Sequence, residues 1–240
     1  MKNPFKRLTK FEWALWLCSL LTVALSFLFG PEKDILSLAA SLLGVTALIF
    51  VAKGMVFGQV LCVVFALVYG VVSFMFRYYG EVITYVGMSA PAAIAAVIAW
   101  LKNPYGDGQE VKVSNLTRRG AVGVATLSVV ITVIFYFVLD ALGTSNLIFS
   151  TLSVTTSVLA ASLVFLRSPY YAIAYAANDV VLIVLWILAA IDDISYLPMI
   201  FCFIAFLAND IYGFVNWRRM ERRQAAECAA AEQTGSQTLT

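Results

Sequence analysis

Histidine is absent from all 240 residues of the chain. A histidine-ligated haem, any other histidine-ligated metal centre and a histidine proton relay are therefore excluded. Charge is also scarce, because Asp, Glu, Lys and Arg make up only 12% of the residues, against 62% hydrophobic residues and a mean hydropathy of +0.89. Such a composition excludes an ordinary soluble globule.

The positions of the cysteines and lysines exclude further classes of protein function. The four cysteines are scattered and never form a Cys-x-x-Cys pair, so we expect small packing residues rather than a redox or metal site. No lysine lies in the middle of an apolar run, which excludes a retinal pump with a Schiff base. No Ser or Cys nucleophile stands beside a base, and no metal-ligand cluster is present. The sequence predicts a protein that is not an enzyme and that needs no cofactor, metal or nucleic-acid partner.

Long apolar runs are what the chain does have. A helix needs about 20 mostly apolar residues to cross the hydrocarbon core of a bilayer. Eight such runs are found, at 11–29, 35–52, 57–76, 82–101, 119–142, 147–166, 169–191 and 194–217. They predict an all-α polytopic membrane protein with eight transmembrane helices. No room is left for a soluble catalytic domain.

The basic residues predict the orientation of these helices. Lys and Arg in short loops stay on the cytoplasmic side of a membrane. With eight alternating helices, all 16 basic residues except Lys33 and Arg77 fall on one side. We therefore expect a multi-pass protein of the cell membrane with both termini in the cytoplasm.

The order of the helices predicts a repeat. Runs six to eight repeat the lengths and directions of runs two to four, and Trp100 and Trp217 end the two triplets. One intervening helix makes the second triplet enter from the same side as the first, which gives a parallel 1+3+1+3 repeat. The expected segments are a tail and peripheral helix at 1–30, a first triplet at 31–101, a loop and connector helix at 102–143, a second triplet at 144–217 and a cytosolic tail at 218–240.

Two Asn-Asp pairs stand out within the last two runs. Asn178 and Asp179 lie about 13 Å from the cytoplasmic end of their helix, and Asn209 and Asp210 about 10–12 Å from the end of theirs, at 1.5 Å per residue. The antiparallel helices would bring both pairs to one level. An Asp at the bilayer centre costs about 2.5–3.5 kcal/mol. The pairs are therefore candidates for a central binding site.

Aromatic residues share faces with these pairs. Tyr171, Tyr175 and Trp186 follow the helical spacing of Asp179 on one helix, and Tyr212 follows that of Asn209 on the next. Gln59 and Tyr69 lie along one stripe of the third run. Aromatic rings beside amides and carboxyls suit a flat ring that bears hydroxyls or a sugar. The alternatives are amides that only join helices, an interfacial belt position for Trp186 and a helix-end role for Gln59.

The sequence resembles a known family at several of these residues. The ending NDIYGFVNW, the Asn-bearing helix before it, the AKGMVFGQV turn and the 1+3+1+3 layout resemble the PnuC family of bacterial vitamin transporters. The resemblance implies a fold like an enlarged SWEET sugar transporter, with Asn178, Asn209, Asp210 and Gln59 as ligands. It also implies facilitated diffusion of nicotinamide riboside, trapping by a cytosolic kinase and a homotrimer.

One departure from the family pattern leaves the substrate open. Family members that take nicotinamide riboside often carry Trp-x-x-Trp seven and four residues before the Asn of the penultimate helix. Here Tyr171 and Ala174 occupy those positions. Another nucleoside, thiamin and riboflavin are therefore alternative substrates. Ion-coupled symport, in which Asp179 and Asp210 would titrate, is an alternative mechanism, and a purely structural membrane protein is a further one.

Overall fold

The computed structural model of the chain describes residues 3–29, 35–75, 82–108 and 110–237. Nearly all of them are helical. Lys33 and Arg77, the two basic residues assigned to the far side of the membrane, lie outside the described residues. The helices are α1 (Lys10–Phe29), α2 (Ile35–Ala52), α3 (Val56–Met75), α5 (Ala90–Leu101), α6 (Arg118–Ala141), α7 (Leu147–Phe165), α8 (Tyr171–Asp192) and α9 (Leu197–Gln237).

Short elements join these helices. A 3-10 turn, η1 (Pro4–Arg7), precedes α1, and another, η3 (Ile194–Tyr196), joins α8 to α9. A π-helical segment, η2 (Ile83–Ser89), precedes α5. The antiparallel strands β1 (Pro104–Tyr105) and β2 (Glu110–Val111) form a small hairpin after α5.

Seven helical stretches in the described part of the chain are long and apolar enough to cross a membrane. They correspond to all of the predicted runs except 35–52, where Leu38–Ala52 forms a shorter apolar helix. Large apolar side chains such as Leu25, Val129 and Ile173 are exposed on the outer faces of the bundle. Such faces fit a lipid environment.

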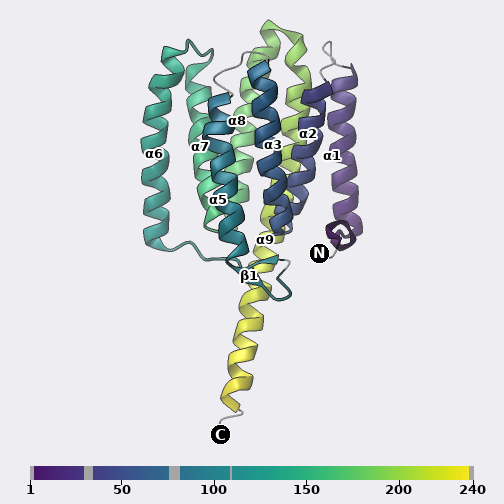
Figure 1. Ribbon diagram of the computed structural model, residues 1–240, viewed down its shortest axis with the longest axis vertical. Coiled ribbons are helices and arrows are strands. Elements are labelled where there is room, and N and C mark those ends of the chain that lie inside the picture. Colours follow the sequence, from purple (N-terminus) through teal and green to yellow (C-terminus); the bar gives the residue numbers. More distant parts are fainter. Residues whose placement is uncertain (1–2, 30–34, 76–81, 109, 238–240) are drawn as a thin grey trace.

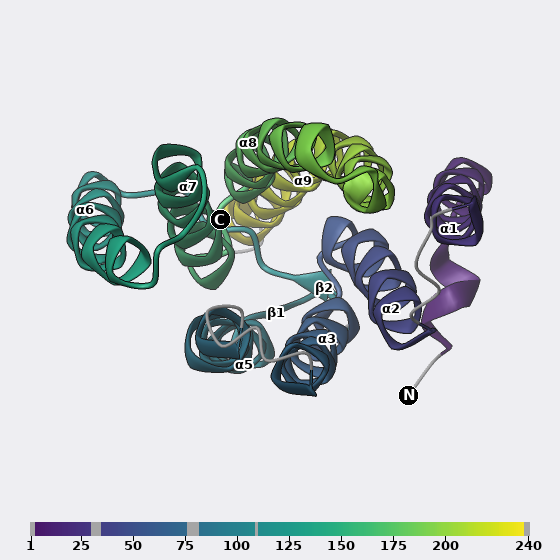
Figure 2. The same cartoon turned by 90° about the horizontal axis from the view of Figure 1, so that it is seen from above.

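The helices form two facing groups (Figure 2). In one group α3 lies between α2 and α5, and in the other α8 packs against α7 and α9. The groups meet along two seams, where α2 packs against α9 and α5 against α7. α1 packs on α2 and α9 at one end of the array, and α6 packs on α7 at the other (Figures 1 and 2).

The segment before Pro91 is not a regular α-helix. A proline lacks the N–H for an i to i−4 bond, and its ring clashes with the preceding turn. The chain takes the wider π-helical turn of η2 up to Ser89 and resumes α-helix at Ala90. The π-helical turn lies within the expected run 82–101, and Ile83–Leu101 remains one helical stretch of membrane-spanning length.

α9 runs 20 residues past the expected end of the last apolar run at 217, to Gln237. Its extension is rich in Ala, Glu, Arg and Gln, which are strong helix formers. The loop after α5 holds the extension: the Gln224 Nε2 donates to the Val111 carbonyl at 3.1 Å, and its Oε1 accepts from the Val113 N–H at 2.8 Å. The Arg223 guanidinium also pairs with Glu110. The tail is thus a docked helix over the described residues.

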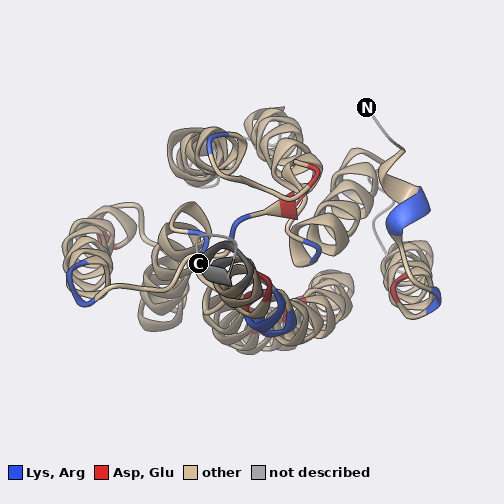
Figure 3. Ribbon diagram, turned by 90° about the horizontal axis from the view of Figure 1, so that it is seen from below, with Lys and Arg blue, Asp and Glu red and all other residues tan. Residues whose placement is uncertain are grey.

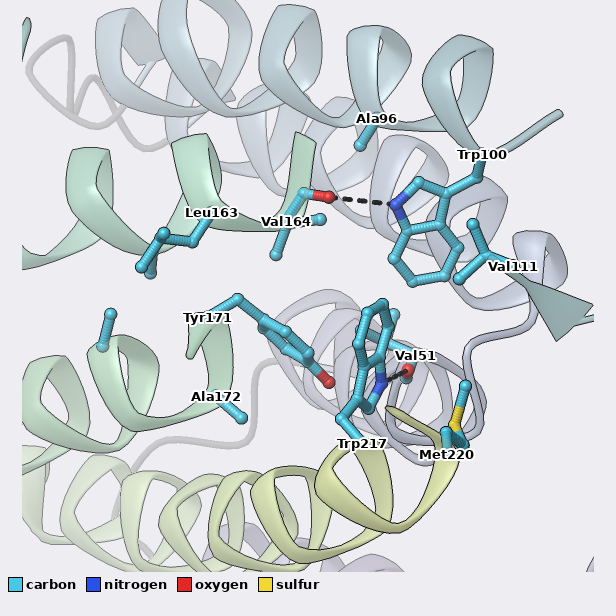
Figure 4. Packing of buried hydrophobic residues seen from close by; sticks show 12 residues of the cluster. Val51, Ala96, Trp100, Val111, Leu163, Val164, Tyr171, Ala172, Trp217 and Met220 are labelled. Carbon is cyan, nitrogen blue, oxygen red and sulfur yellow. Dashed lines mark hydrogen bonds between the residues drawn. The ribbon is translucent and has the colours of Figure 1, made fainter. Parts of the chain in front are cut away.

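The largest apolar cluster closes the bundle at the end where this hairpin lies. Trp100, Trp217 and Val111 are fully buried there, with Tyr171 and Met220 beside them (Figure 4). Both termini emerge at this same end (Figure 1). Lys and Arg residues gather at it when the protein is viewed along the helix axes (Figure 3). We call it the basic end.

Candidate functional site

Asp179 of α8 and Asp210 of α9 lie together inside the helix bundle. Their side chains are 3% and 5% exposed. The two carboxyl groups lie close enough to form a side-chain hydrogen bond when one of them is protonated. The Oδ2 of Asp179 is buried and has no hydrogen-bond partner among the described residues. The sequence argument placed the two Asp residues at one level, and the structure brings them into direct contact.

Four elements enclose this pair of carboxyl groups, which we call the acidic pair. Cys62 of α3 interacts electrostatically with Asp210, as do Tyr171 and Tyr175 of α8. Cys202 of α9 lies near Asp179, and its thiol is hydrogen-bonded to the side chain of Ser41 on α2. The acidic pair is therefore surrounded by thiols and phenol rings contributed by α3, α8 and α9, with α2 behind.

Asn178 turns away from the acidic pair. Its Oδ1 accepts hydrogen bonds from the hydroxyls of Thr156 at 2.7 Å and Ser157 at 3.1 Å, both on α7. Consecutive residues on a helix point about 100° apart, so Asn178 and Asp179 cannot face the same neighbour. The Asn178 amide joins α8 to α7, while Asp179 faces α9.

Asn209 turns outward in the same way. Its Nδ2 donates to the hydroxyl of Ser19 on α1 at 2.8 Å and to the Ala205 carbonyl at 2.8 Å. The side chain is 1% exposed, and its Oδ1 is buried without a partner in the described part of the chain. Each Asn-Asp pair therefore directs its amide to a flanking helix and its carboxyl to the acidic pair.

Tyr212 also faces α1 rather than the acidic pair. Its hydroxyl donates to the Glu12 Oε1 at 2.5 Å. The same carboxylate receives the Lys53 Nζ at 2.7 Å, and its Oε2 accepts from the Thr9 N–H at 2.6 Å. The three side chains Glu12, Lys53 and Tyr212 join α1, the end of α2 and α9 near the basic end.

Tyr171 packs within the apolar cluster of the basic end. Its ring lies 4.9 Å from that of Trp217 and edge-on to it (Figure 4). The ring of Tyr175 lies 6.3 Å from that of Tyr171, also edge-on. Gly213 of α9 makes room for it, because a Cβ there would lie 3.2 Å from the Tyr171 hydroxyl oxygen. Tyr171 thus lies between the acidic pair and the apolar cluster of the basic end. The half-buried Tyr175 lies one helical turn further along α8.

Gln59 and Tyr69 lie at opposite ends of α3. Gln59 is buried on the first turn, at the side of the basic end. Tyr69 forms an aromatic group with Tyr85 of η2, at 4.4 Å between ring centroids, and with Phe65 at 5.7 Å. The π-helical turn of η2 thus carries an aromatic side chain to the stripe of α3 that the sequence had singled out.

Trp186 lies towards the far end of α8. Its ring is 5.5 Å from that of Tyr196 in η3. Its Nε1 is buried without a hydrogen-bond partner among the residues that the structure describes. The predicted site residues thus form an inner set around the acidic pair (Asp179, Asp210, Tyr171, Tyr175) and outlying positions at Asn178, Asn209, Tyr212, Trp186, Gln59 and Tyr69.

The comparison with known families gives these positions a context. Residues 34–219 match the family described as nicotinamide mononucleotide transporter. The chain belongs to this family of PnuC transporters. It is accordingly a membrane transporter rather than an enzyme, and the matched residues include every predicted site position.

Named PnuC relatives cover nearly the whole chain. The nicotinamide riboside transporter PnuC of Neisseria mucosa is 28% identical over 225 residues, which are 91% of this chain and 85% of the relative. The protein of the same name from Haemophilus influenzae is 24% identical over 191 residues, 78% of this chain and 81% of the relative. A crystal structure of the vitamin B3 transporter PnuC superimposes with a TM-score of 0.75 at 27% identity, covering 90% of this chain and 94% of that one.

Several neighbours of the candidate site in this PnuC protein were not among the predicted residues. Thr156 and Ser157 hold Asn178, Ser19 holds Asn209, and Cys62 and Cys202 adjoin the acidic pair. Small hydroxyl and thiol side chains are common in membrane helices, where they serve close packing. Composition alone therefore could not separate these from other Ser, Thr and Cys residues.

Proposed function

We propose that this PnuC protein imports nicotinamide riboside across the cell membrane. The observation that carries the proposal is the acidic pair with its tyrosines, buried inside a chain that aligns over 91% of its length with a nicotinamide riboside transporter. The nicotinamide ring is flat and the ribose bears hydroxyls. Aromatic rings and hydrogen-bonding groups together suit both parts of such a molecule.

The proposed mechanism is alternating access by two halves of the bundle. We infer eight transmembrane helices in a parallel, SWEET-like 1+3+1+3 arrangement, with α2, α3 and α5 as one half and α7, α8 and α9 as the other. The common direction of α2 and α7 in Figure 1 supports this division. Because the halves meet along the α2–α9 and α5–α7 seams, rocking at these seams would expose the centre to each side in turn.

The basic end is proposed to face the cytoplasm. Its collection of Lys and Arg residues supports that orientation, which places both termini inside the cell (Figure 3). Transport is then facilitated diffusion, made unidirectional when a cytosolic kinase phosphorylates the riboside that enters. A homotrimer is the proposed assembly.

The proposed binding residues follow from the positions described above. Asp179, Asp210, Tyr175 and Tyr171 form the inner set, and Gln59, Tyr69 and Trp186 border the path towards either end. Asn178, Asn209 and Tyr212 are kept as proposed site residues, since their movement between states would change which groups they meet. Their hydrogen bonds to α7 and α1 support a second role as anchors of α8 and α9.

Calorimetry with purified protein tests the substrate. Nicotinamide riboside, thymidine, thiamin and riboflavin are titrated side by side in the same detergent. Tight binding of nicotinamide riboside alone supports the proposal, with Tyr171 in place of the family tryptophan. Tight binding of another compound reassigns the substrate to another nucleoside, thiamin or riboflavin. No binding of any compound by a folded protein overturns the assignment to this group of vitamins.

Two substitutions test the site. Asn209→Leu and Asn178→Leu are expected to abolish binding while the protein remains folded and extractable. Ser19→Ala and Thr156→Ala serve as matched controls, because each removes only the partner of one amide. If both Leu variants bind as the wild type does, the two amides are anchors only.

Ion-coupled symport is the second candidate mechanism. The buried acidic pair favours it, because carboxyl groups within a membrane often carry protons or bind ions along a pathway. Uptake into proteoliposomes that lack any kinase separates the two mechanisms. Accumulation above the external concentration that collapses with the proton or sodium gradient supports symport, whereas equilibration without regard to either gradient supports facilitated diffusion.

A further inference from the structure

The acidic pair is buried without a positive partner among the residues that the structure describes. Asp179 and Asp210 are 3% and 5% exposed, and their carboxyl groups adjoin each other. The ion pairs in the described part of the chain lie elsewhere, at Glu12–Lys53 and at residues of the basic end. The unpartnered Asp179 Oδ2 is thus an acceptor with nothing to accept from.

The groups that face the acidic pair do not supply a charge of opposite sign. The titratable side chains around it are Cys62 from α3, Tyr171 and Tyr175 from α8, and Cys202 from α9. All four are neutral or negative in every protonation state. The basic residues of the described helices lie in their end turns or in the extension of α9: Lys10 begins α1, Arg118 and Arg119 begin α6, and Arg218, Arg219, Arg222 and Arg223 follow Trp217.

A negative charge in such a place needs a positive one. Burial of an isolated carboxylate in a membrane interior is costly, and the cost is removed by a proton or by a cation. The side chains of Tyr171 and Tyr175 lie near the pair, and the face of an aromatic ring attracts cations and not anions. A flat molecule with a fixed positive charge on its ring would meet both features at once.

We infer that Asp179 and Asp210 form a cation-selective subsite that binds the positively charged ring of an N-ribosylated pyridine. This inference rests on the proposed function, because the nicotinamide ring of nicotinamide riboside is a pyridinium with a fixed charge. Thiamin carries a fixed charge too, whereas riboflavin and thymidine are neutral at pH 7. The acidic pair therefore selects the charged members of that group, and binding of the cation displaces a proton from the pair to water.

An uncharged analogue isolates the effect of charge. The reduced riboside, 1,4-dihydronicotinamide riboside, keeps the ribose and the carboxamide but has no positive charge. Its binding and that of nicotinamide riboside are measured by calorimetry with the full-length protein at mildly alkaline pH, where the reduced compound is stable. We expect the reduced compound to bind at least about tenfold more weakly, since a partly buried charge pair is worth more than the 1.4 kcal/mol that a tenfold ratio represents.

Calorimetry in two buffers with different ionisation enthalpies measures whether a proton is released on binding. Nicotinamide riboside is expected to give different observed enthalpies in the two buffers, because a proton leaves the acidic pair and is taken up by the buffer. The reduced riboside is expected to give equal enthalpies. Equal enthalpies for both compounds overturn the proton displacement.

Substitutions locate the effect. Asp210→Asn and Asp179→Asn keep the size of each side chain and remove its charge, and each is expected to reduce the preference for the charged riboside to about twofold or less, with binding of the reduced compound retained. Asp192→Asn is the matched control, because Asp192 is an exposed acidic residue at the far end of α8, the helix of Asp179. This variant is expected to keep the wild-type preference for the charged riboside. Gel filtration and thermal unfolding show that each variant is folded.

The outcomes separate this inference from the proposed function. If the wild type binds both ribosides equally well, the cation subsite is wrong and the proposed function stands. If a folded wild-type protein binds neither, the proposed function fails. If Asp210→Asn and Asp179→Asn weaken both compounds to the same degree, the carboxyl groups hold the ribose or the carboxamide and the inference is overturned.

Discussion

The ring centroids of Trp100 and Trp217 lie 5.4 Å apart. Each indole N–H donates a hydrogen bond to the group of helices that the other tryptophan belongs to. The Trp100 Nε1 donates to the Val164 carbonyl of α7 at 3.0 Å, and the Trp217 Nε1 donates to the Val51 carbonyl of α2 at 3.0 Å (Figure 4). The last helix of each group is thus bound to the end of the first helix of the other. This reciprocal pair of bonds fastens the two groups together at the basic end.

Loss of either indole N–H is expected to destabilise the protein. Trp100→Phe and Trp217→Phe each remove one hydrogen bond to a buried carbonyl, which is worth about 0.5–1.5 kcal/mol. The Val164 and Val51 carbonyls keep the backbone N–H donors of Arg167 and Gly54. Thermal unfolding in detergent measures the effect. The two effects are also expected to be non-additive in the double variant, because the rings touch. Trp13→Phe, at a ring that is 37% exposed, is the control, and equal midpoints for all three single variants would contradict the prediction.

Glu12 is expected to be the most sensitive acidic residue for stability. It is 1% exposed and accepts from Lys53, Tyr212 and the backbone of Thr9. Glu12→Gln leaves the Lys53 ammonium, which is 17% exposed, without its counter-charge, and breaking a buried ion pair costs about 3–5 kcal/mol. The free energies of unfolding of Glu12→Gln, Lys53→Met and the double variant, compared with the wild type, form a double-mutant cycle. A double variant less stable than either single one would argue against this account.

Gly58 is expected not to accept a side chain. A Cβ at this position would lie 2.4 Å from the Val51 backbone nitrogen and 2.7 Å from the Phe50 carbonyl carbon, where α2 and α3 approach each other. Gly58→Ala therefore forces the two helices apart and should lower the yield of folded protein and its unfolding temperature. Gly123→Ala on α6 is the control, because nothing lies within 4 Å of a Cβ there. Similar behaviour of both variants would show that the turn can adjust.

Tyr105 is expected to lose its proton at a higher pH than an ordinary tyrosine. Its hydroxyl donates to the Glu227 carboxylate at 2.5 Å, and this bond raises the pKa of Tyr105 to about 12. The raised pKa means that the contact between the hairpin and α9 is fully present below the unfolded pKa of about 10 and is lost as the pH rises through the folded value. Carbon-13 tyrosine resonances, assigned with Tyr105→Phe, measure the midpoint. Glu227→Gln should return it towards 10; an unchanged midpoint would refute the cause.

Much of the fold could be predicted from the order of residues alone. Crossing a bilayer demands long apolar helices, so the segments of the chain that become helices are evident from composition. A carboxyl group inside such a helix is expensive, so Asp179 and Asp210 stand out, and equal depths on antiparallel neighbours placed them together. The structure brings them into contact as that argument expected.

The directions of neighbouring polar residues could not be predicted in the same way. Helical spacing put Asn209 and Tyr212 on one face, but spacing does not say which helix that face meets. The structure turns this face to α1, where the partners are Ser19 and Glu12. The amides of Asn178 and Asn209 hold α8 and α9 to flanking helices, a direction that the equal level of the two Asn-Asp pairs did not reveal.

The sequence by itself determined the membrane setting, the helical segments and the position of the acidic pair along two neighbouring helices, because these depend on length, hydropathy and the cost of a charge in lipid. Only the tertiary structure decided the rotation of each helix about its axis, the π-helical turn before Pro91 and the docking of the α9 extension on the hairpin. Helix rotation is set by the packing of many small contacts with neighbours that are distant in the chain, and no local pattern records it.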